Sequence, residues 1–170
     1  MKSAKKILAL ILAGVMALAL LTGCGKAASL NRTIAEGLAE HTKLLLAEAG
    51  SENITSVSYQ VPELSRNIAP LFDENWITQN DDGDDVLTDD AKKTLTDILS
   101  SYMLDSYVAF YATDVTDVKN PVLEVLNLTY SDIAFRSTVS DLNSITSLKV
   151  AVTHKTVNGR TYALAVMIGK

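Results

Sequence analysis

The chain has 170 residues, of which 48% are apolar, and its formal net charge is -5. This apolar content excludes a disordered chain and is enough for one folded domain. The excess of acids excludes nucleic-acid binding through phosphates and adhesion to anionic lipid through a basic face, because both need clustered lysine and arginine. With a single cysteine, an intramolecular disulfide is excluded as well.

The first 24 residues have the pattern of an export signal. Three lysines precede an apolar run over residues 7–21, which is shorter than the roughly 20 apolar residues that a membrane-spanning helix needs. The run ends in Leu21-Thr22-Gly23-Cys24. This segment resembles the lipobox of bacterial lipoproteins, a class in which the signal is removed before the cysteine and the cysteine becomes the lipidated first residue.

The resemblance implies a domain organisation and a location. Residues 1–23 are expected to be the signal peptide, residues 24–29 a lipidated N-terminus with a short tether, and residues 30–170 a single domain. Palmitate-type acylation of Cys24 would make membrane lipid a partner and place the protein on the extracytoplasmic face of a bacterial membrane. Loss of three leader lysines leaves 12 basic against 20 acidic residues, a charge of -8.

The first half of the predicted domain begins with a helix and a strand. Residues 30–49 are predicted to be helical because apolar side chains recur on one stripe. Thr33 and Glu36 have the spacing of a capping box, and Gly50 is expected to end the helix. Residues 54–61 alternate and are rich in β-branched side chains, which predicts a strand.

The middle of the chain is predicted to be mostly helical. A short helix is expected at 63–72. The segment 73–90 is predicted to be a loop rich in aspartate and glutamate, which we call the acidic loop. A longer helix is predicted to start near Thr88 and run to about residue 111. Residues 120–139 allow two interpretations. The favoured one is a short helix that begins at Asn120-Pro121 and is followed by a strand. The other is a strand at 122–130.

The C-terminal segment predicts a β-hairpin. Asn158-Gly159 is the strongest short hairpin signal and separates two strands at 147–157 and 160–168. A two-residue turn pairs Val157 with Arg160. The last strand is apolar on both faces, so it is expected to lie nearer the centre of the sheet than its partner. The fold class is therefore predicted to be α+β, with an antiparallel sheet that ends in this hairpin and packs against two main helices.

The acidic loop has two interpretations. It carries eight acids and no lysine or arginine before Lys92. Calcium collects carboxylates on flexible glycine-containing loops, so a calcium site is one hypothesis. An EF-hand register with Gly83 in sixth place fails at three positions. The alternative is a solvated loop that needs no cofactor. The residues proposed as calcium ligands are Asp81, Asp82, Asp84 and Asp85.

Catalytic machinery is not evident in the sequence. The two histidines are His41, expected as a hydrogen-bonded residue at the core boundary, and His154, expected on a strand near the hairpin end. The chain has no Gly-x-Ser-x-Gly motif and no histidine pair with zinc spacing. No catalytic residue is therefore assigned, although carboxylates or a serine that meet only in space would allow a hydrolase.

Aromatic residues cluster between residues 72 and 111. Core packing is one interpretation, and a groove that binds a sugar or a peptide is the other, because aromatic faces offer a large contact area. The binding hypothesis names Trp76, Tyr102 and Tyr107. The favoured function is a non-enzymatic binding or interaction module with an unidentified protein or small-molecule partner. The alternatives are a secreted hydrolase and a structural subunit that docks on an envelope membrane complex.

Overall fold

The computed structural model describes residues 26–48, 54–104, 106–137 and 144–170. They form an α+β fold around a five-stranded sheet with the strand order β1-β6-β7-β4-β5, which confirms the predicted class. The sheet is mostly antiparallel, and β1 pairs in parallel with β6. The predictions for Cys24 and Gly50 fall outside the described residues.

The predicted C-terminal hairpin is present. Strands β6 (Ser147–Val157) and β7 (Arg160–Gly169) are joined by a two-residue turn. Asn158 and Gly159 both have positive φ, 48° and 84°, which is the geometry that a tight turn between twisted strands requires. Val157 pairs with Arg160, so the register is the predicted one.

Strand β7 is the central strand of the sheet, as its two apolar faces predicted. Its alternate side chains enter two separate core clusters. Tyr162, Leu164, Val166 and Ile168 lie on one face, and Ala163, Ala165 and Met167 lie on the other. The sheet therefore has to be covered on both sides.

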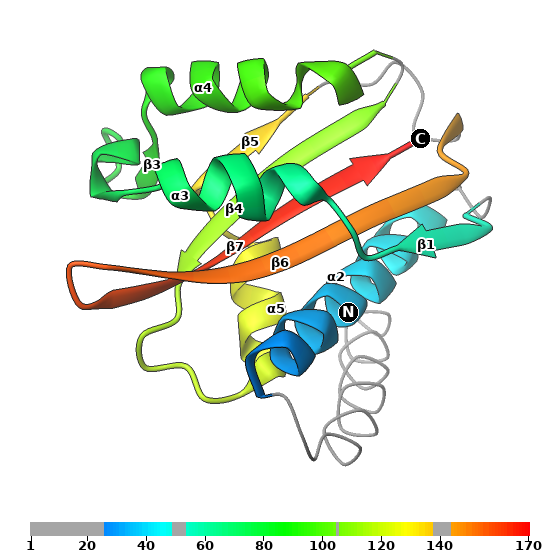
Figure 1. The fold of residues 1–170 in the computed structure, drawn as a ribbon, viewed down its shortest axis with the longest axis horizontal. Helices are drawn as coiled ribbons and strands as arrows, with labels where there is room; N and C mark the ends of the chain where they lie inside the picture. The colour runs from blue at the N-terminus through cyan, green and yellow to red at the C-terminus, as the bar shows by residue number, and fades with distance from the viewer. Residues whose placement is uncertain (1–25, 49–53, 105, 138–143) are drawn as a thin grey trace.

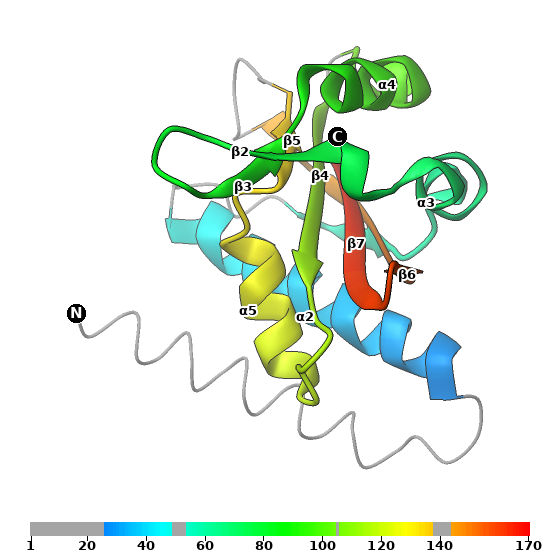
Figure 2. The same cartoon turned by 90° about the vertical axis from the view of Figure 1, so that its left-hand side faces the viewer.

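Helices supply that cover (Figures 1 and 2). On one face lie α2 (Lys26–Glu48) and α5 (Pro121–Thr129), which contribute to the cluster around Ala163. On the other face lie a π-helical turn (Leu64–Ile68), α3 (Ala69–Leu71) and α4 (Asp89–Leu99). Among the described segments, no helix combines the length and apolar character needed to cross a membrane.

Strand β4 (Tyr107–Asp114) corrects the prediction of a helix up to residue 111. The helix ends with α4 and one 3-10 turn (Ser100–Tyr102). The segment from Tyr107 onward is a continuous apolar run, and periodicity alone cannot distinguish a buried strand from a buried helix in such a run. An eight-residue antiparallel ladder with β7 decides the outcome in favour of the strand.

The remaining elements match the predictions in kind but differ in length. Strand β1 (Ser56–Ser58) is shorter than predicted. Residues 120–139 form α5 and then β5 (Ala134–Arg136), and Asn120 caps α5 by accepting a hydrogen bond from the backbone N–H of Val122 at 2.9 Å. The capping-box prediction is wrong, because Thr33 lies well inside α2.

The acidic loop contains structure that the sequence analysis missed. A 3-10 turn (Glu74–Trp76) leads into a small hairpin made of β2 (Ile77–Gln79) and β3 (Asp85–Leu87). The side-chain oxygen of Asn80 closes its turn by accepting from backbone N–H groups at positions 82 and 84. Strands of three residues are too short for alternation to reveal them.

Candidate functional site

Two tyrosines project from the same face of β4. Side chains alternate along a strand, so Tyr107, Ala109 and Tyr111 face α2, whereas Val108 and Phe110 face α4. The hydroxyl oxygens of Tyr107 and Tyr111 lie 3.1 Å apart and share a hydrogen bond. The small Ala109 between them leaves room for a side chain from the neighbouring strand.

Arg136 is that side chain. It lies on the edge strand β5 directly opposite Ala109, so it shares the face of the two tyrosines. Its Nε donates a hydrogen bond to the hydroxyl of Tyr111 at 3.3 Å, and its guanidinium carbon lies 5.1 Å from the centre of the Tyr111 ring. Strand register therefore brings together two phenols and one cation.

These three residues line one side of a cavity of about 300 Å³, which we call the Arg136 pocket. Helix α2 forms another wall with side chains at helical spacing, and β6, β7 and α5 complete the lining. Ligand pockets commonly occupy about 300–1,000 Å³ and combine apolar walls with a few polar groups. The remaining lining residues are Leu38, Thr42, Leu45, Leu46, Thr129, Ile145, Leu148 and Met167.

The polar groups of the Arg136 pocket are held as hydrogen-bond donors. Burial raises the pKa of Tyr107, and the neighbouring Tyr111 raises it further. The hydrogen bond to Tyr111 raises the pKa of Arg136. At neutral pH the Tyr107 phenol therefore keeps its proton and the guanidinium keeps its charge.

The three aromatic residues predicted to bind a ligand do not meet in one groove. Trp76 is 9% exposed and packs in the core on the α4 side, where its ring contacts Phe72 and Phe110. Tyr102 follows α4, and its hydroxyl donates to Glu63 at 2.9 Å. Tyr107 lies on the opposite face of the sheet and lines the Arg136 pocket.

The four aspartates proposed as calcium ligands are all exposed. Asp84 and Asp85 border an open depression of about 410 Å³ that also contains Asp114, Asp132 and Arg160. Across residues 26–48, 54–104, 106–137 and 144–170, no three histidine, cysteine, aspartate or glutamate side chains are arranged to hold a metal ion. The turn that carries these aspartates is closed by Asn80.

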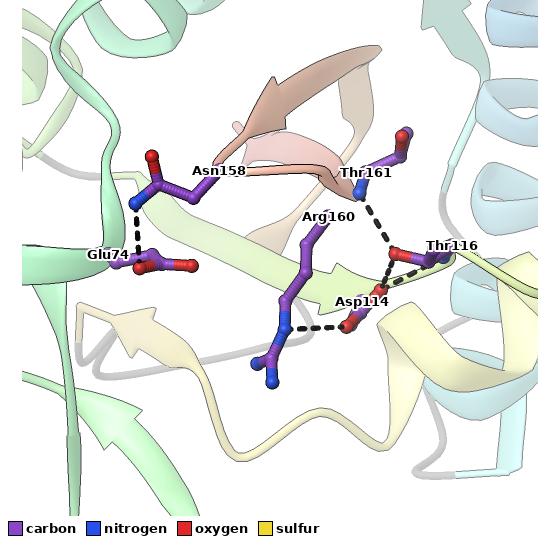
Figure 3. A network of polar contacts seen from close by, with 6 residues as sticks. All are labelled: Glu74, Asp114, Thr116, Asn158, Arg160 and Thr161. Carbon is purple, nitrogen blue, oxygen red and sulfur yellow. Dashed lines mark hydrogen bonds and ion pairs between the residues drawn. The ribbon is translucent and has the colours of Figure 1, made fainter.

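A polar network at the end of the main hairpin lies beside this depression (Figure 3). Asn158 donates to Glu74 at 2.9 Å, and the backbone N–H of Thr161 donates to Thr116 at 3.0 Å. Arg160 lies 4.0 Å from Asp114, whose carboxylate also accepts from Thr116. Exposed pairs of this kind contribute little to stability.

His154 joins three elements through partly buried polar contacts. Its Nε2 lies 2.8 Å from a carboxylate oxygen of Glu124 on α5, and its Nδ1 lies 2.7 Å from the side-chain oxygen of Asn31 on α2. Glu124 is only 4% exposed. We call this arrangement the His154 chain. Both ring nitrogens are occupied, so neither is available to accept a proton from a serine.

His41 differs from its predicted role as a hydrogen-bonded boundary residue. It is 3% exposed, and neither ring nitrogen has a hydrogen-bond partner among the described residues. The edge of its ring contacts Tyr130, with ring centres 6.3 Å apart. Burial lowers the pKa of His41, although the negative charge of Glu48 acts in the opposite direction. The folded state therefore holds a neutral imidazole.

Sequence reasoning missed Arg136 and Thr42 as candidate site residues, and it included Tyr111 only as a member of the aromatic cluster. The two tyrosines are four residues apart, a spacing that puts them on one face of a strand as well as of a helix. Nothing local marks Arg136, because its place depends on the pairing of β4 with β5.

Comparison with known proteins gave no matching family model, no matching protein with a curated description and no matching solved structure.

Removal of the His154 ring is expected to destabilise the domain. His154→Ala leaves the buried Glu124 carboxyl and the Asn31 amide without their shared partner, at a cost of about 1–3 kcal/mol in the free energy of unfolding. Thr156→Ala, at an exposed position on the same strand, is the matched control. Urea unfolding measures both variants, and equal midpoints would contradict the structural role of the His154 chain.

The stability of the domain is expected to fall as the pH drops below about 6.5, the ordinary pKa of histidine. The unfolded chain takes up a proton at His41 below that pH, whereas the folded state takes it up only at lower pH. Protonation therefore favours unfolding until the pH passes the lowered folded-state pKa. His41→Phe should reduce the loss in melting temperature between neutral and mildly acidic pH, and an unchanged loss would contradict this origin.

Proposed function

We propose that this chain is a lipid-anchored lipoprotein on the extracytoplasmic face of a bacterial membrane and that its folded domain binds a small molecule in the Arg136 pocket. The observation that carries the binding function is the composition of that pocket: a largely apolar lining, two phenols and one guanidinium. Such a surface is suited to hold a ligand by burial of its apolar part and to orient it by a few polar contacts.

The lining supports binding rather than chemical conversion. Among the described residues it contains no histidine, cysteine, aspartate or glutamate that could act as a nucleophile or a general base, and the raised pKa values of Tyr107 and Arg136 keep both side chains protonated at neutral pH. The proposed role is therefore non-enzymatic and requires no cofactor. The hydrolase alternative gains no support from His154, because Asn31 and Glu124 occupy both of its ring nitrogens.

The alternative of a docking subunit has weaker support. In the described part of the chain, the exposed large apolar side chains are spread over several elements on both sides of the sheet: Leu45 on α2, Leu71 on α3, Leu104 after α4, and Leu123 and Tyr130 on or next to α5. A stable interface generally needs a contiguous apolar patch of several hundred Å². The small-molecule pocket therefore remains the favoured site.

Membrane attachment is expected to depend on Cys24. Cys24→Ala removes the thiol that would accept lipid, so the variant should lose incorporation of labelled palmitate and move from the membrane fraction to the medium or to the soluble fraction. Two acyl chains hold a protein on a membrane, whereas one chain binds marginally. Ser29→Ala serves as the control, and palmitate labelling that persists in the Cys24 variant would refute the anchor.

Ligand binding is expected to depend on an open Arg136 pocket. The neutral dye N-phenylnaphthylamine fluoresces strongly in apolar surroundings and should bind to the purified domain with one-to-one stoichiometry. Leu45→Trp places a larger side chain at a position that is 44% exposed and lines the pocket, so it should reduce dye binding without disrupting the core.

The matched control is Leu123→Trp, which makes the same change at a position that is 49% exposed on α5 and outside the pocket lining. It should bind the dye as the parent chain does. Far-ultraviolet circular dichroism and melting temperature confirm that both variants are folded. Equal binding by the two variants would show that the dye binds elsewhere, and absence of binding by the parent chain would remove the support for a small-molecule pocket.

A further inference from the structure

We infer that the Arg136 pocket takes a single-chain organic anion, such as a medium-chain carboxylate, with its charged head at Arg136 and Tyr107 and its tail along α2. This inference rests on the proposed binding function and names the chemical class of the ligand. Three features of the pocket carry it: the balance of donors and acceptors at its mouth, the sign of the charges that line it, and the arrangement of its apolar walls.

The polar end of the pocket has more hydrogen-bond donors than its own hydrogen bonds use. The two tyrosine hydroxyls carry two protons, and their mutual hydrogen bond at 3.1 Å uses one of them. Arg136 has five N–H groups, of which its Nε bond to Tyr111 uses one and its hydrogen bond to Tyr107 uses another. Among the described residues no acceptor other than these two phenols is bonded to the guanidinium. Within that part of the chain, one phenolic proton and the remaining guanidinium N–H groups are free to bind an acceptor on a ligand.

The charges around the pocket favour an anion as that acceptor. Arg136 is its only charged lining residue among the described residues, in a chain whose net charge is -5. In the described part of the chain no carboxylate lies within the 4 Å of an ion pair with Arg136, unlike Arg32 and Arg160, and Asp132 acts on its charge only from farther away. A guanidinium without a carboxylate at ion-pair distance, next to a phenol, matches the planar acceptor geometry of a carboxylate.

The rest of the lining is suited to an unbranched apolar tail. Leu38, Leu46 and Leu148 are buried side chains of the lining, and Met167 adds a flexible side chain that adapts to the shape of its neighbour. The volume of about 300 Å³ is at the small end of ligand pockets. It suits one short chain better than the two chains of a phospholipid.

Displacement of N-phenylnaphthylamine from the purified domain tests the ligand class. Octanoate, octanol and octylamine share one chain and differ in the charge of the head, so octanoate should displace the dye at the lowest concentration and octylamine at the highest. Arg136→Gln should weaken octanoate by about tenfold, the worth of one charge-assisted hydrogen bond, and leave octanol unchanged.

Two further variants keep the test specific. Arg136→Lys retains the charge, so it should preserve part of the preference for octanoate over octanol. Arg66→Gln removes an arginine from a different surface depression and should behave as the parent chain does. Dioctanoylphosphatidylglycerol separates a free single-chain anion from a membrane lipid, and it should compete less well than octanoate.

The possible failures are distinguishable. Two results would overturn the ligand class: equal displacement of the dye by octanoate and octanol, or unchanged octanoate binding in the Arg136→Gln variant. In both cases, dye binding to the parent chain would still support the pocket. Stronger competition by the two-chain lipid would overturn the commitment to a single chain. Loss of dye binding in the parent chain would instead remove the proposed function on which the inference rests.

Discussion

The burial of both faces of β7 is the constraint on which the rest of the structure depends. Its side chains from Tyr162 to Ile168 are all buried, and they alternate between two core clusters. An apolar strand of this kind is stable only with strands on both edges and other elements packed on both faces. Each large apolar side chain left exposed would lose the roughly 1.5–3 kcal/mol of stabilisation that its burial gives. The five-stranded sheet between two layers of helices meets that requirement.

The Arg136 pocket lies where this cover meets the edge of the sheet. Helix α2 covers aliphatic side chains of β6 and β7, and its residues line the cavity together with the guanidinium and the two phenols. Arg136 is on the edge strand β5 and is exposed, so its charge stays hydrated while Tyr111 is buried beside it. The position at the edge of the sheet therefore allows a charged side chain next to an otherwise apolar wall, because the charge keeps its contact with water.

The His154 chain connects the pocket to the stability of the fold. Asn31 belongs to α2 and Glu124 to α5, and both helices also contribute residues to the pocket lining. The buried Glu124 carboxyl is tolerated because a ring nitrogen of His154 satisfies it. The contacts of His154 connect both helices to β6, so the walls of the pocket are held by a partly buried polar link as well as by apolar packing.

The sequence by itself determined the features that depend on neighbouring residues. Asn158-Gly159 defined the register of the main hairpin, the two-faced apolar pattern of β7 indicated its central position, and Asn120-Pro121 marked the start of α5. The same local patterns could not assign β4, because its apolar run has no period that separates strand from helix. Only the tertiary structure decided that assignment, through the ladder with β7. It also decided the candidate site, since Arg136 meets the two tyrosines through the pairing of β4 with β5, and no local pattern encodes a contact between residues so far apart in the chain.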